Sequence, residues 1–282
     1  MNVADAMTPR SDLVVAEIPG SRDDVLAHVQ ERGFSSVPVV KDADGAEVYR
    51  GLVTRDDLIA QPDEDQLALL MREVPTTGAG EDIGDAAKRM VTEGARRLPV
   101  VDGDELVGIL TVTDVVRAIA RGEVDGETPA SDLATRAVNA TYAETPLPVA
   151  EREIALSGVP YAVVLDDDAK PAGMLTEVDV LAVARVVEGE ASTGDSIADQ
   201  DSEWSWEGIK ATGARYLPTR NVEIPAEAVR EFMTADIVTV GTTRTAREVA
   251  QELISNDIEQ VPLVSGTEIE GVVRDVDLLE GL

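Results

Sequence analysis

The sequence contains no cysteine and a single histidine among 282 residues. Disulfide bonds and thiolate chemistry are therefore excluded, and a histidine-rich metal site is not favoured. No stretch approaches the roughly 20 consecutive apolar residues that a membrane-spanning helix needs. The first ten residues also lack the basic and then apolar order of a signal peptide. We therefore expect a soluble, cytoplasmic protein.

Basic residues are scarce as well. The chain has 24 Lys and Arg residues against 55 Asp and Glu residues, which gives a net charge of −31. Such a charge argues against binding to nucleic-acid phosphates or to anionic lipid surfaces. Few of the basic residues are Lys, and acidic residues recur in every segment. This pattern favours a halophile that accumulates salt, and an ordinary acidic cytosolic protein is the alternative.

What the sequence does contain is a fourfold repeat. A glycine, two apolar residues, a Thr or Arg, and an Asp three positions later recur at 51–57, 108–114, 173–179 and 271–277. A short apolar strand precedes each cluster, and an amphipathic stretch with helical spacing precedes that strand. Each repeat therefore predicts the order strand, helix, strand, strand, helix.

A short entry motif precedes each repeat: Ala6-Met7-Thr8, Leu70-Met71-Arg72, the degraded Leu133-Ala134-Thr135, and Phe232-Met233-Thr234. With these entries the chain resembles the CBS (cystathionine-beta-synthase) family. The resemblance implies an α+β fold of four β-α-β-β-α CBS repeats, packed pairwise, one with two and three with four, into two Bateman modules. The implied segments are 1–62, 63–122, 123–187 and 229–282, with an acidic linker and then an aromatic-containing insert at 188–228.

The Thr-x-x-Asp pairs allow two interpretations. A Thr followed three residues later by an acid is a helix capping box. In the family that this chain resembles, the same Asp accepts hydrogen bonds from the ribose hydroxyls of an adenosyl ligand, which suits an ionised carboxylate. Both roles can coexist. The candidate pairs are Thr54 with Asp57, Thr111 with Asp114, and Thr176 with Asp179.

The fourth cluster departs from this pattern because Arg274 replaces the hydroxyl residue. Its guanidinium is predicted either to pair with Asp277, which would occupy the ribose acceptor, or to meet a ligand phosphate.

The residues just before each apolar strand reach the ligand's phosphates or base in the family. Only the second repeat is cationic there, and an adenine nucleotide (AMP, ADP or ATP) is its expected effector. The alternative is a surface pair neutralised by acids such as Glu93. The predicted ligand residues of this cleft are Arg96, Arg97, Thr111, Thr113 and Asp114, completed by residues 13–15; those of the companion cleft are Ser36, Thr54 and Asp57, completed by residues 74–77.

The third and fourth repeats are a poorer receptor for phosphates, because Pro160 and Glu259 offer no cationic donor. Thr176 and Asp179 suit an uncharged or cationic adenosyl ligand such as S-adenosylmethionine, or else this module is empty. The insert carries Trp204, Trp206 and Tyr216. Such residues predict packing over its own module, or a contact that plugs a cleft or binds a partner.

Catalysis has little support in the sequence. His28 lies on a predicted surface helix, and no glycine-rich phosphate loop is present. Acidic runs such as Asp166 to Asp168 are interpreted as turn residues rather than metal ligands. We therefore expect no enzyme. Two hypotheses remain: a regulator that senses an adenosyl ligand and signals to an unknown protein partner, and a ligand-free scaffold. A homodimer is compatible with either.

Overall fold

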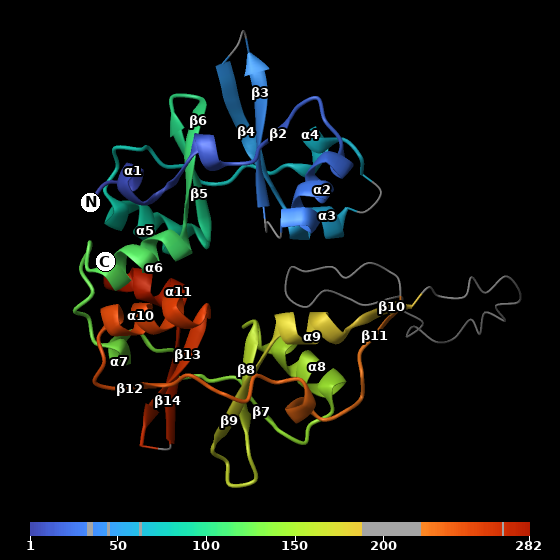
Figure 1. Ribbon diagram of the computed structural model, residues 1–282, viewed down its shortest axis with the longest axis vertical. Coiled ribbons are helices and arrows are strands. Elements are labelled where there is room, and N and C mark those ends of the chain that lie inside the picture. The colour runs from blue at the N-terminus through green and yellow to red at the C-terminus, as the bar shows by residue number, and fades with distance from the viewer. Residues whose placement is uncertain (33–35, 44–45, 62–63, 188–220, 267) are drawn as a thin grey trace, which may run out of the picture. The chain divides into compact units, whose positions relative to one another are not determined.

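The computed structural model describes residues 1–32, 36–43, 46–61, 64–187, 221–266 and 268–282 (Figure 1). Their contacts form two compact units, Met1–Ala137 with Val238–Leu282, and Val138–Ile237. Both units mix helices with strands, as predicted. This division cuts across the predicted segments, whose boundaries remain a prediction. Within the described residues no helix is long and apolar enough to cross a membrane.

The predicted element order is confirmed in repeats 1, 3 and 4, and repeat 2 lacks only the first strand. Repeat 1 holds β2 (Ala16–Glu17), α2 (Arg22–Arg32), β3 (Ser36–Ala43), β4 (Ala46–Thr54) and α3 (Arg55–Ala60). Repeat 2 holds α5 (Ile83–Glu93), β5 (Arg97–Asp102), β6 (Glu105–Thr111) and α6 (Val112–Arg121), and an isolated bridge between Thr77 and Val100 replaces the first strand. Repeat 3 holds β7 (Ala140–Tyr142), α8 (Leu147–Ser157), β8 (Tyr161–Leu165), β9 (Pro171–Thr176) and α9 (Glu177–Val183). Repeat 4 holds β12 (Val240–Gly241), α10 (Ala246–Asn256), β13 (Gln260–Ser265), β14 (Glu268–Arg274) and α11 (Asp275–Leu278), followed by η3 (Leu279–Gly281).

The strands of each repeat pair in the same way. The first strand, or in repeat 2 the bridge at Thr77, runs parallel to the second strand, and the second strand pairs antiparallel with the third. This register places Ser36 opposite Thr54 and Arg97 opposite Thr111. Each hydroxyl residue therefore lies at a strand end, where the following helix begins. Repeats 1 and 2 are joined into one sheet by the pairing of β4 with β6, so their predicted pairing is confirmed.

The entry segments are exchanged between paired repeats. The entry of repeat 1, with α1 (Val3–Ala6), β1 (Thr8–Pro9) and η1 (Arg10–Asp12), pairs with β6 of repeat 2. The entry of repeat 2, which follows α4 (Leu67–Leu70), returns to β4 through Arg72 and Leu52. Likewise α7 (Ala130–Leu133) leads into a bridge between Thr135 and β14, and η2 (Val229–Glu231) leads into a bridge between Thr234 and β9.

This exchange explains the glycine that opens every cluster. A Cβ atom added there would lie 2.7 to 2.9 Å from a backbone oxygen of the exchanged entry segment, closer than real Cβ atoms come. Only glycine allows the segment to approach so closely. The four positions are Gly51, Gly108, Gly173 and Gly271, which face the carbonyl oxygens of Arg72, Thr8, Thr234 and Thr135.

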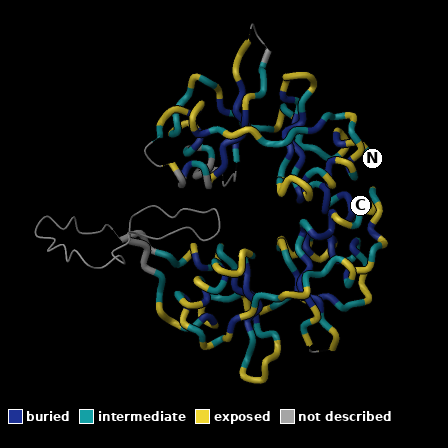
Figure 2. Tube along the Cα trace, turned by 180° about the vertical axis from the view of Figure 1, so that it is seen from behind, coloured by how far each residue is buried: buried dark blue, intermediate teal, exposed yellow. Residues whose placement is uncertain are grey.

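Apolar residues of the helices pack with those of the strands into the cores. The buried residues are dark blue in Figure 2. Repeat 1 has a core of its own around Val37 and Leu58. Repeat 3 packs around Leu147 and Ile154, with Val229 from an entry segment. Repeats 2 and 4 instead share one core, in which α5 and α6 contribute residues together with α10, α11 and η3.

The strand β10 (Arg185–Val187) pairs antiparallel with β11 (Asn221–Glu223). The chain between these strands includes Trp204, Trp206 and Tyr216, so the prediction for those aromatic residues lies outside the described residues.

Candidate functional site

Each Thr-x-x-Asp pair begins a helix and forms a reciprocal capping box. The threonine Oγ1 accepts a hydrogen bond from the backbone N–H of the Asp three residues later, at 3.2 to 3.3 Å. In turn, Oδ2 of the Asp accepts hydrogen bonds from the backbone N–H and the hydroxyl of the same threonine, at 2.6 to 2.9 Å. The capping interpretation is therefore confirmed for Thr54 with Asp57, Thr111 with Asp114, and Thr176 with Asp179.

The second oxygen of each carboxylate distinguishes the four repeats. Within the described part of the chain, Oδ1 of Asp57 and of Asp179 accepts no hydrogen bond. Oδ1 of Asp114 accepts one from Nη1 of Arg117 at 3.0 Å. In repeat 4 the Arg274 guanidinium contacts both oxygens of Asp277, with the shortest distance, 2.6 Å, between Nη2 and Oδ1. The predicted pairing of Arg274 with Asp277 is thus confirmed.

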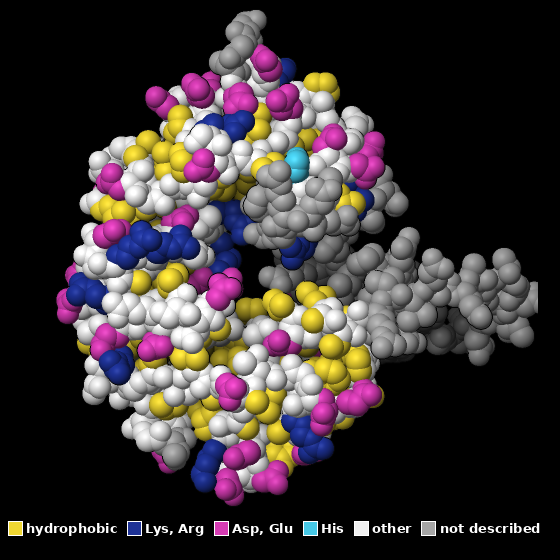
Figure 3. Space-filling model, viewed as in Figure 1, with side chains coloured by type: hydrophobic (Ala, Val, Ile, Leu, Met, Phe, Trp, Pro, Cys, Tyr) yellow, Lys and Arg dark blue, Asp and Glu magenta, His cyan; other side chains and the backbone are white. Residues whose placement is uncertain are grey.

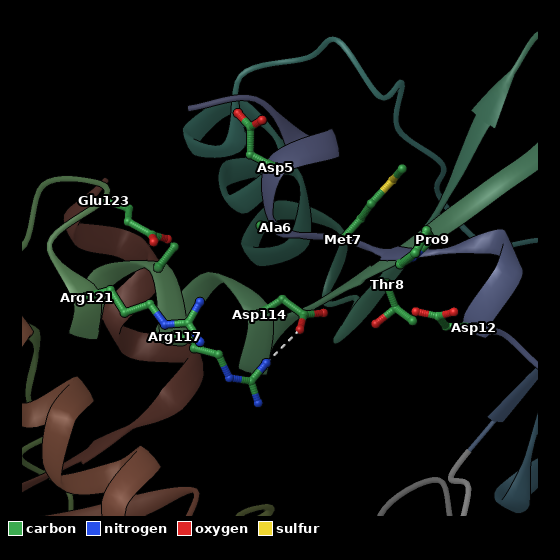
Figure 4. Close-up of a pocket in the computed structure, with 11 residues that line it drawn as sticks. Asp5, Ala6, Met7, Thr8, Pro9, Asp12, Asp114, Arg117, Arg121 and Glu123 are labelled. Carbon is green, nitrogen blue, oxygen red and sulfur yellow. Dashed lines mark hydrogen bonds and ion pairs between the residues drawn. The ribbon is translucent and has the colours of Figure 1, made fainter.

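A cavity of about 360 Å³ opens beside Asp114 (Figure 4). One wall is the entry segment of repeat 1, and the other is the face of α6 that follows the capping box. Thr111 fixes the Asp114 carboxylate at the rim, and Arg117 and Arg121 follow it along the helix. The lining residues are Asp5, Ala6, Met7, Thr8, Pro9, Asp12, Asp114, Arg117, Ala118, Arg121 and Glu123.

Charges of both signs meet in this cavity. The acids Asp5 and Asp12 line the wall of the entry segment, whereas the two arginines lie on α6 (Figure 4). The Arg117 side chain is 42% exposed, and its Asp114 partner is 10% exposed. Arg121 has no ion pair with any residue that the structure describes. The α6 side of the cavity can therefore offer two guanidinium groups one helical turn apart, next to a fixed carboxylate.

The predicted ligand residues of repeat 2 do not all reach this cavity. Asp114 lines it, and Thr111 holds Asp114 in place. Thr113 is exposed on the first turn of α6, and Arg97 begins β5 opposite Thr111. The cavity wall is the entry segment at residues 5–9 with Asp12, rather than the predicted residues 13–15.

Arg96 was predicted to bind a ligand in the same cleft as Asp114, but it does not line the cavity. Its Nη2 lies 2.6 Å from Oδ2 of Asp275 and 3.3 Å from Oε1 of Glu259, two acids of repeat 4. The alternative prediction, neutralisation by nearby acids, is right in kind, but the partners are these two residues and not Glu93. Burial lowers the pKa of Arg96, yet the hydrogen bond and charge of Asp275 outweigh burial and raise that pKa above its ordinary value.

The companion cluster in repeat 1 gains a cation that sequence reasoning missed. Nε of Arg72, from the exchanged entry segment, lies 3.5 Å from Oδ2 of Asp57. Ser36 faces Thr54 across the strand pair, as the predicted cleft requires. Arg72 stands where other entries have Thr, and that substitution was the available signal.

The acidic run of repeat 3 has the structural role that was predicted. Oδ1 of Asp166 accepts hydrogen bonds from the backbone N–H groups of Asp168 and Lys170, both at 2.9 Å, which closes the turn between β8 and β9. Among the described residues, no group of three or more acidic or histidine side chains is arranged to hold a metal ion. On the face shown in Figure 3, acidic side chains are spread over the surface rather than gathered in one patch.

Comparison with known proteins agrees with the repeat architecture. Residues 3–63, 67–121 and 229–282 match the CBS domain, which is more than half of the chain. The chain belongs to the CBS domain family. Its mixed α and β fold, with exchanged entry segments, is that of paired CBS repeats in Bateman modules. Residues 123–187 lie outside the matched ranges, although their element order is the same.

Several known proteins are similar to all or part of the chain. The uncharacterized protein MJ1404 of Methanocaldococcus jannaschii is 26% identical over 279 residues, which are 99% of this chain and 61% of MJ1404. This chain therefore spans less than two thirds of that relative. A crystal structure of an uncharacterized conserved protein from Pyrococcus horikoshii is 26% identical, with a TM-score of 0.70, and covers 100% of this chain and 99% of its own. CBSX2, a chloroplastic CBS domain-containing protein of Arabidopsis thaliana, is 31% identical over 151 residues, which are 41% of this chain and 62% of CBSX2.

Proposed function

We propose that this chain is a regulatory protein that binds an adenosyl ligand and signals the binding to a protein partner. The observation that carries the proposal is the cavity beside α6, where a carboxylate fixed by Thr111 is followed by Arg117 and Arg121. A volume of about 360 Å³ is at the lower end of the range for small-molecule pockets. The cavity therefore has the size and the polar groups for a nucleoside carrying one phosphate.

The ribose contact requires a local exchange of partners. Oδ2 of Asp114 is engaged by Thr111, and Oδ1 is held by Arg117 at 3.0 Å. Ribose hydroxyls would displace Arg117 from Oδ1. Because the arginine is 42% exposed, the displaced ion pair is worth at most about 0.5 kcal/mol. The released guanidinium, together with Arg121, then pairs with phosphate oxygens. Arg117 thus favours ligands with a phosphate over ligands without one.

Adenine nucleotides are the first ligands to test, with S-adenosylmethionine as the competing class. CBSX2, which is related to this chain by sequence, has been crystallised with AMP. The acids Asp5, Asp12 and Glu123 also line the cavity, and they oppose a long, uncompensated polyphosphate. AMP, with a single phosphate, suits this mixture of charges better than free ATP.

The signal is proposed to travel through α6. Val115, Val116 and Ile119 on this helix are buried in the core that repeat 2 shares with α10 and α11 of repeat 4. A ligand at the first turn of α6 therefore contacts an element packed between two repeats. Only a ligand that binds two arrangements of these repeats with different affinity can shift them.

The proposal extends to the parts of the chain without a family match. We take residues 123–187, which form repeat 3, as a diverged CBS repeat, because they have the element order of the others and a capping box of the same kind, Thr176 with Asp179. We also propose that the protein acts by binding rather than catalysis, in the cytoplasm of a halophile. The net charge of −31 supports the last point, since high salt screens its self-repulsion.

A ligand-free scaffold is the second candidate. The observation that favours it is the occupation of the carboxylates: Arg274 contacts both oxygens of Asp277, and Arg117 holds Oδ1 of Asp114. In this alternative the repeats serve only as packing surfaces.

Titration calorimetry of the full chain at molar KCl separates the two candidates, with AMP, ATP, adenosine and S-adenosylmethionine as probes. We expect AMP to bind, Asp114→Asn to abolish binding, and Asp277→Asn, the matched control in repeat 4, to leave it unchanged. Arg117→Gln removes both the competitor of the ribose and a phosphate partner. It should therefore strengthen adenosine binding and weaken AMP binding. No heat with any probe would favour the scaffold.

A further inference from the structure

Repeats 2 and 4 carry opposite charges at equivalent positions. Arg96 precedes β5 and accepts a backbone hydrogen bond from Val112, the first residue of α6, at 2.9 Å. Glu259 precedes β13 and accepts the same bond from Asp275, the first residue of α11, at 2.8 Å. Arg96 therefore corresponds to Glu259, and Val112 corresponds to Asp275. The two repeats make the same backbone hydrogen bond here, but repeat 2 carries one positive side chain at these two positions and repeat 4 carries two negative ones.

These equivalent positions meet in the folded chain. Arg96 contacts Asp275 through two hydrogen bonds, Nη2 to Oδ2 at 2.6 Å and Nη1 to Oδ1 at 3.2 Å. Nη2 also lies 3.3 Å from Glu259. The Asp275 side chain is only 8% exposed, and its Oδ1 accepts a further bond from the backbone N–H of Val276 at 2.7 Å. Arg96, Glu259 and Asp275 form what we call the Arg96 cluster.

The cluster lies beside the apolar core that repeats 2 and 4 share. The helices α6 and α10 pack closely there, with Val116 and Ile119 on one side and Val249 and Leu253 on the other. Apolar packing of this kind is not selective, because any similar helix pair could supply it. A nearly buried carboxylate is selective, since it is strongly destabilising without a cation opposite.

We infer that the Arg96 cluster selects the partner of this helical face. The face accepts a repeat of opposite charge, which is repeat 4 of the same chain, and rejects the identical repeat of a second copy. A symmetric contact of repeat 2 with repeat 2 would bring Arg96 close to Arg96, and a contact of repeat 4 with repeat 4 would oppose Glu259 and Asp275 to themselves. Both contacts place like charges in a partly dehydrated interface. The assignment does not depend on whether the chain binds an adenosyl ligand.

A charge exchange in the full chain tests this inference. Arg96→Asp and Asp275→Arg should each lower the thermal unfolding midpoint, and the double exchange should recover most of the loss. The expected coupling is roughly tenfold in the unfolding equilibrium constant. Because Asp275 would face the new acid, the exchange Arg96→Glu with Glu259→Arg is made together with Asp275→Asn, and it repeats the test at a more exposed acid. Arg89→Met, which breaks an ion pair with Glu81 inside repeat 2, is the matched control and should show no coupling with Asp275→Arg.

Partner choice has its own readout. The Arg96→Asp chain and the Asp275→Arg chain are each mismatched internally, but each complements the other. An equimolar mixture should form a 1:1 complex in size-exclusion chromatography with light scattering, whereas neither variant alone should do so. Losses that simply add in both exchanges, or variants that elute separately when mixed, would overturn the inference.

Discussion

Replacing Asp114 with Ala tests how the first turn of α6 is held. The change removes two hydrogen bonds to Oδ2, from the Thr111 backbone N–H at 2.9 Å and from its hydroxyl at 2.7 Å. The reciprocal half of a capping box contributes about 1 kcal/mol. The carboxylate charge near the helix N-terminus adds roughly 0.3–1 kcal/mol. The half-exposed pair with Arg117 adds at most about 0.5 kcal/mol.

The expected loss is therefore about 2 kcal/mol, or a decrease of roughly 4–8 °C in the unfolding midpoint for a unit of this size. Differential scanning calorimetry without ligand measures it. Asp179→Ala is the matched control, because its Oδ2 accepts the same two bonds from Thr176 at 2.8 and 2.7 Å. It should cost less by about 0.5 kcal/mol, since no described arginine pairs with it. A loss at Asp114 below about 0.5 kcal/mol would contradict a capping role, and an unfolded variant would mean that Asp114 stabilises more than the first turn of α6.

Three further changes test other parts of the structure. Arg274→Thr should free Oδ1 of Asp277, while Oδ2 keeps its bond from the backbone N–H of residue 274 and gains the threonine hydroxyl, so that the AMP stoichiometry measured by calorimetry rises by one; an unchanged stoichiometry would contradict this. Gly108→Ala places a Cβ 2.7 Å from the Thr8 carbonyl oxygen and should lower the unfolding free energy, measured in urea, by about 1–3 kcal/mol. Gly80→Ala, whose Cβ meets nothing within 4 Å, is the control and should be nearly neutral. Equal effects would argue against the exchanged entry segment. Burial raises the pKa of Glu81, but hydrogen bonds from Thr77 and Arg89 and the charge of Arg89 outweigh it and hold that pKa below its ordinary value of 4.5. Because the pKa of Glu81 is lower in the folded protein, the ionised carboxylate stabilises the fold above pH 4.5, and this stabilisation is lost as the pH falls through the native pKa. The difference in unfolding free energy between wild type and Glu81→Gln should therefore be full at neutral pH and shrink below pH 4.5. A difference independent of pH would be evidence against the charged role.

The features predicted correctly from the sequence are mainly local ones. The capping boxes and the pairing of Arg274 with Asp277 join residues three positions apart, so the residue types and the helix start determine them. The order of elements follows from short apolar periods and turns. The pairing of repeats 1 and 2 is long-range, and it was available only through the family resemblance.

The features that were missed depend on distant contacts. The partner of Arg96 lies 179 residues away, and no local pattern shows that Asp275 will face it. Arg117 is three residues from Asp114 and its spacing was visible. Its place in a cavity depends on the exchanged entry segment around Thr8, which belongs to the other repeat. The cluster glycines were recognised as a repeat, but their reason, a close backbone approach, appears only when the paired repeats are assembled.

We propose above all that an adenosyl ligand binds beside α6 through Asp114. A crystal structure of the full chain grown with AMP at high salt tests it most directly. We predict ribose hydroxyls on Oδ1 of Asp114, with Arg117 turned from that oxygen toward the phosphate and Arg121 beside it. AMP bound elsewhere, or a map in which Arg117 still holds Asp114 and the cavity contains only solvent, would contradict it.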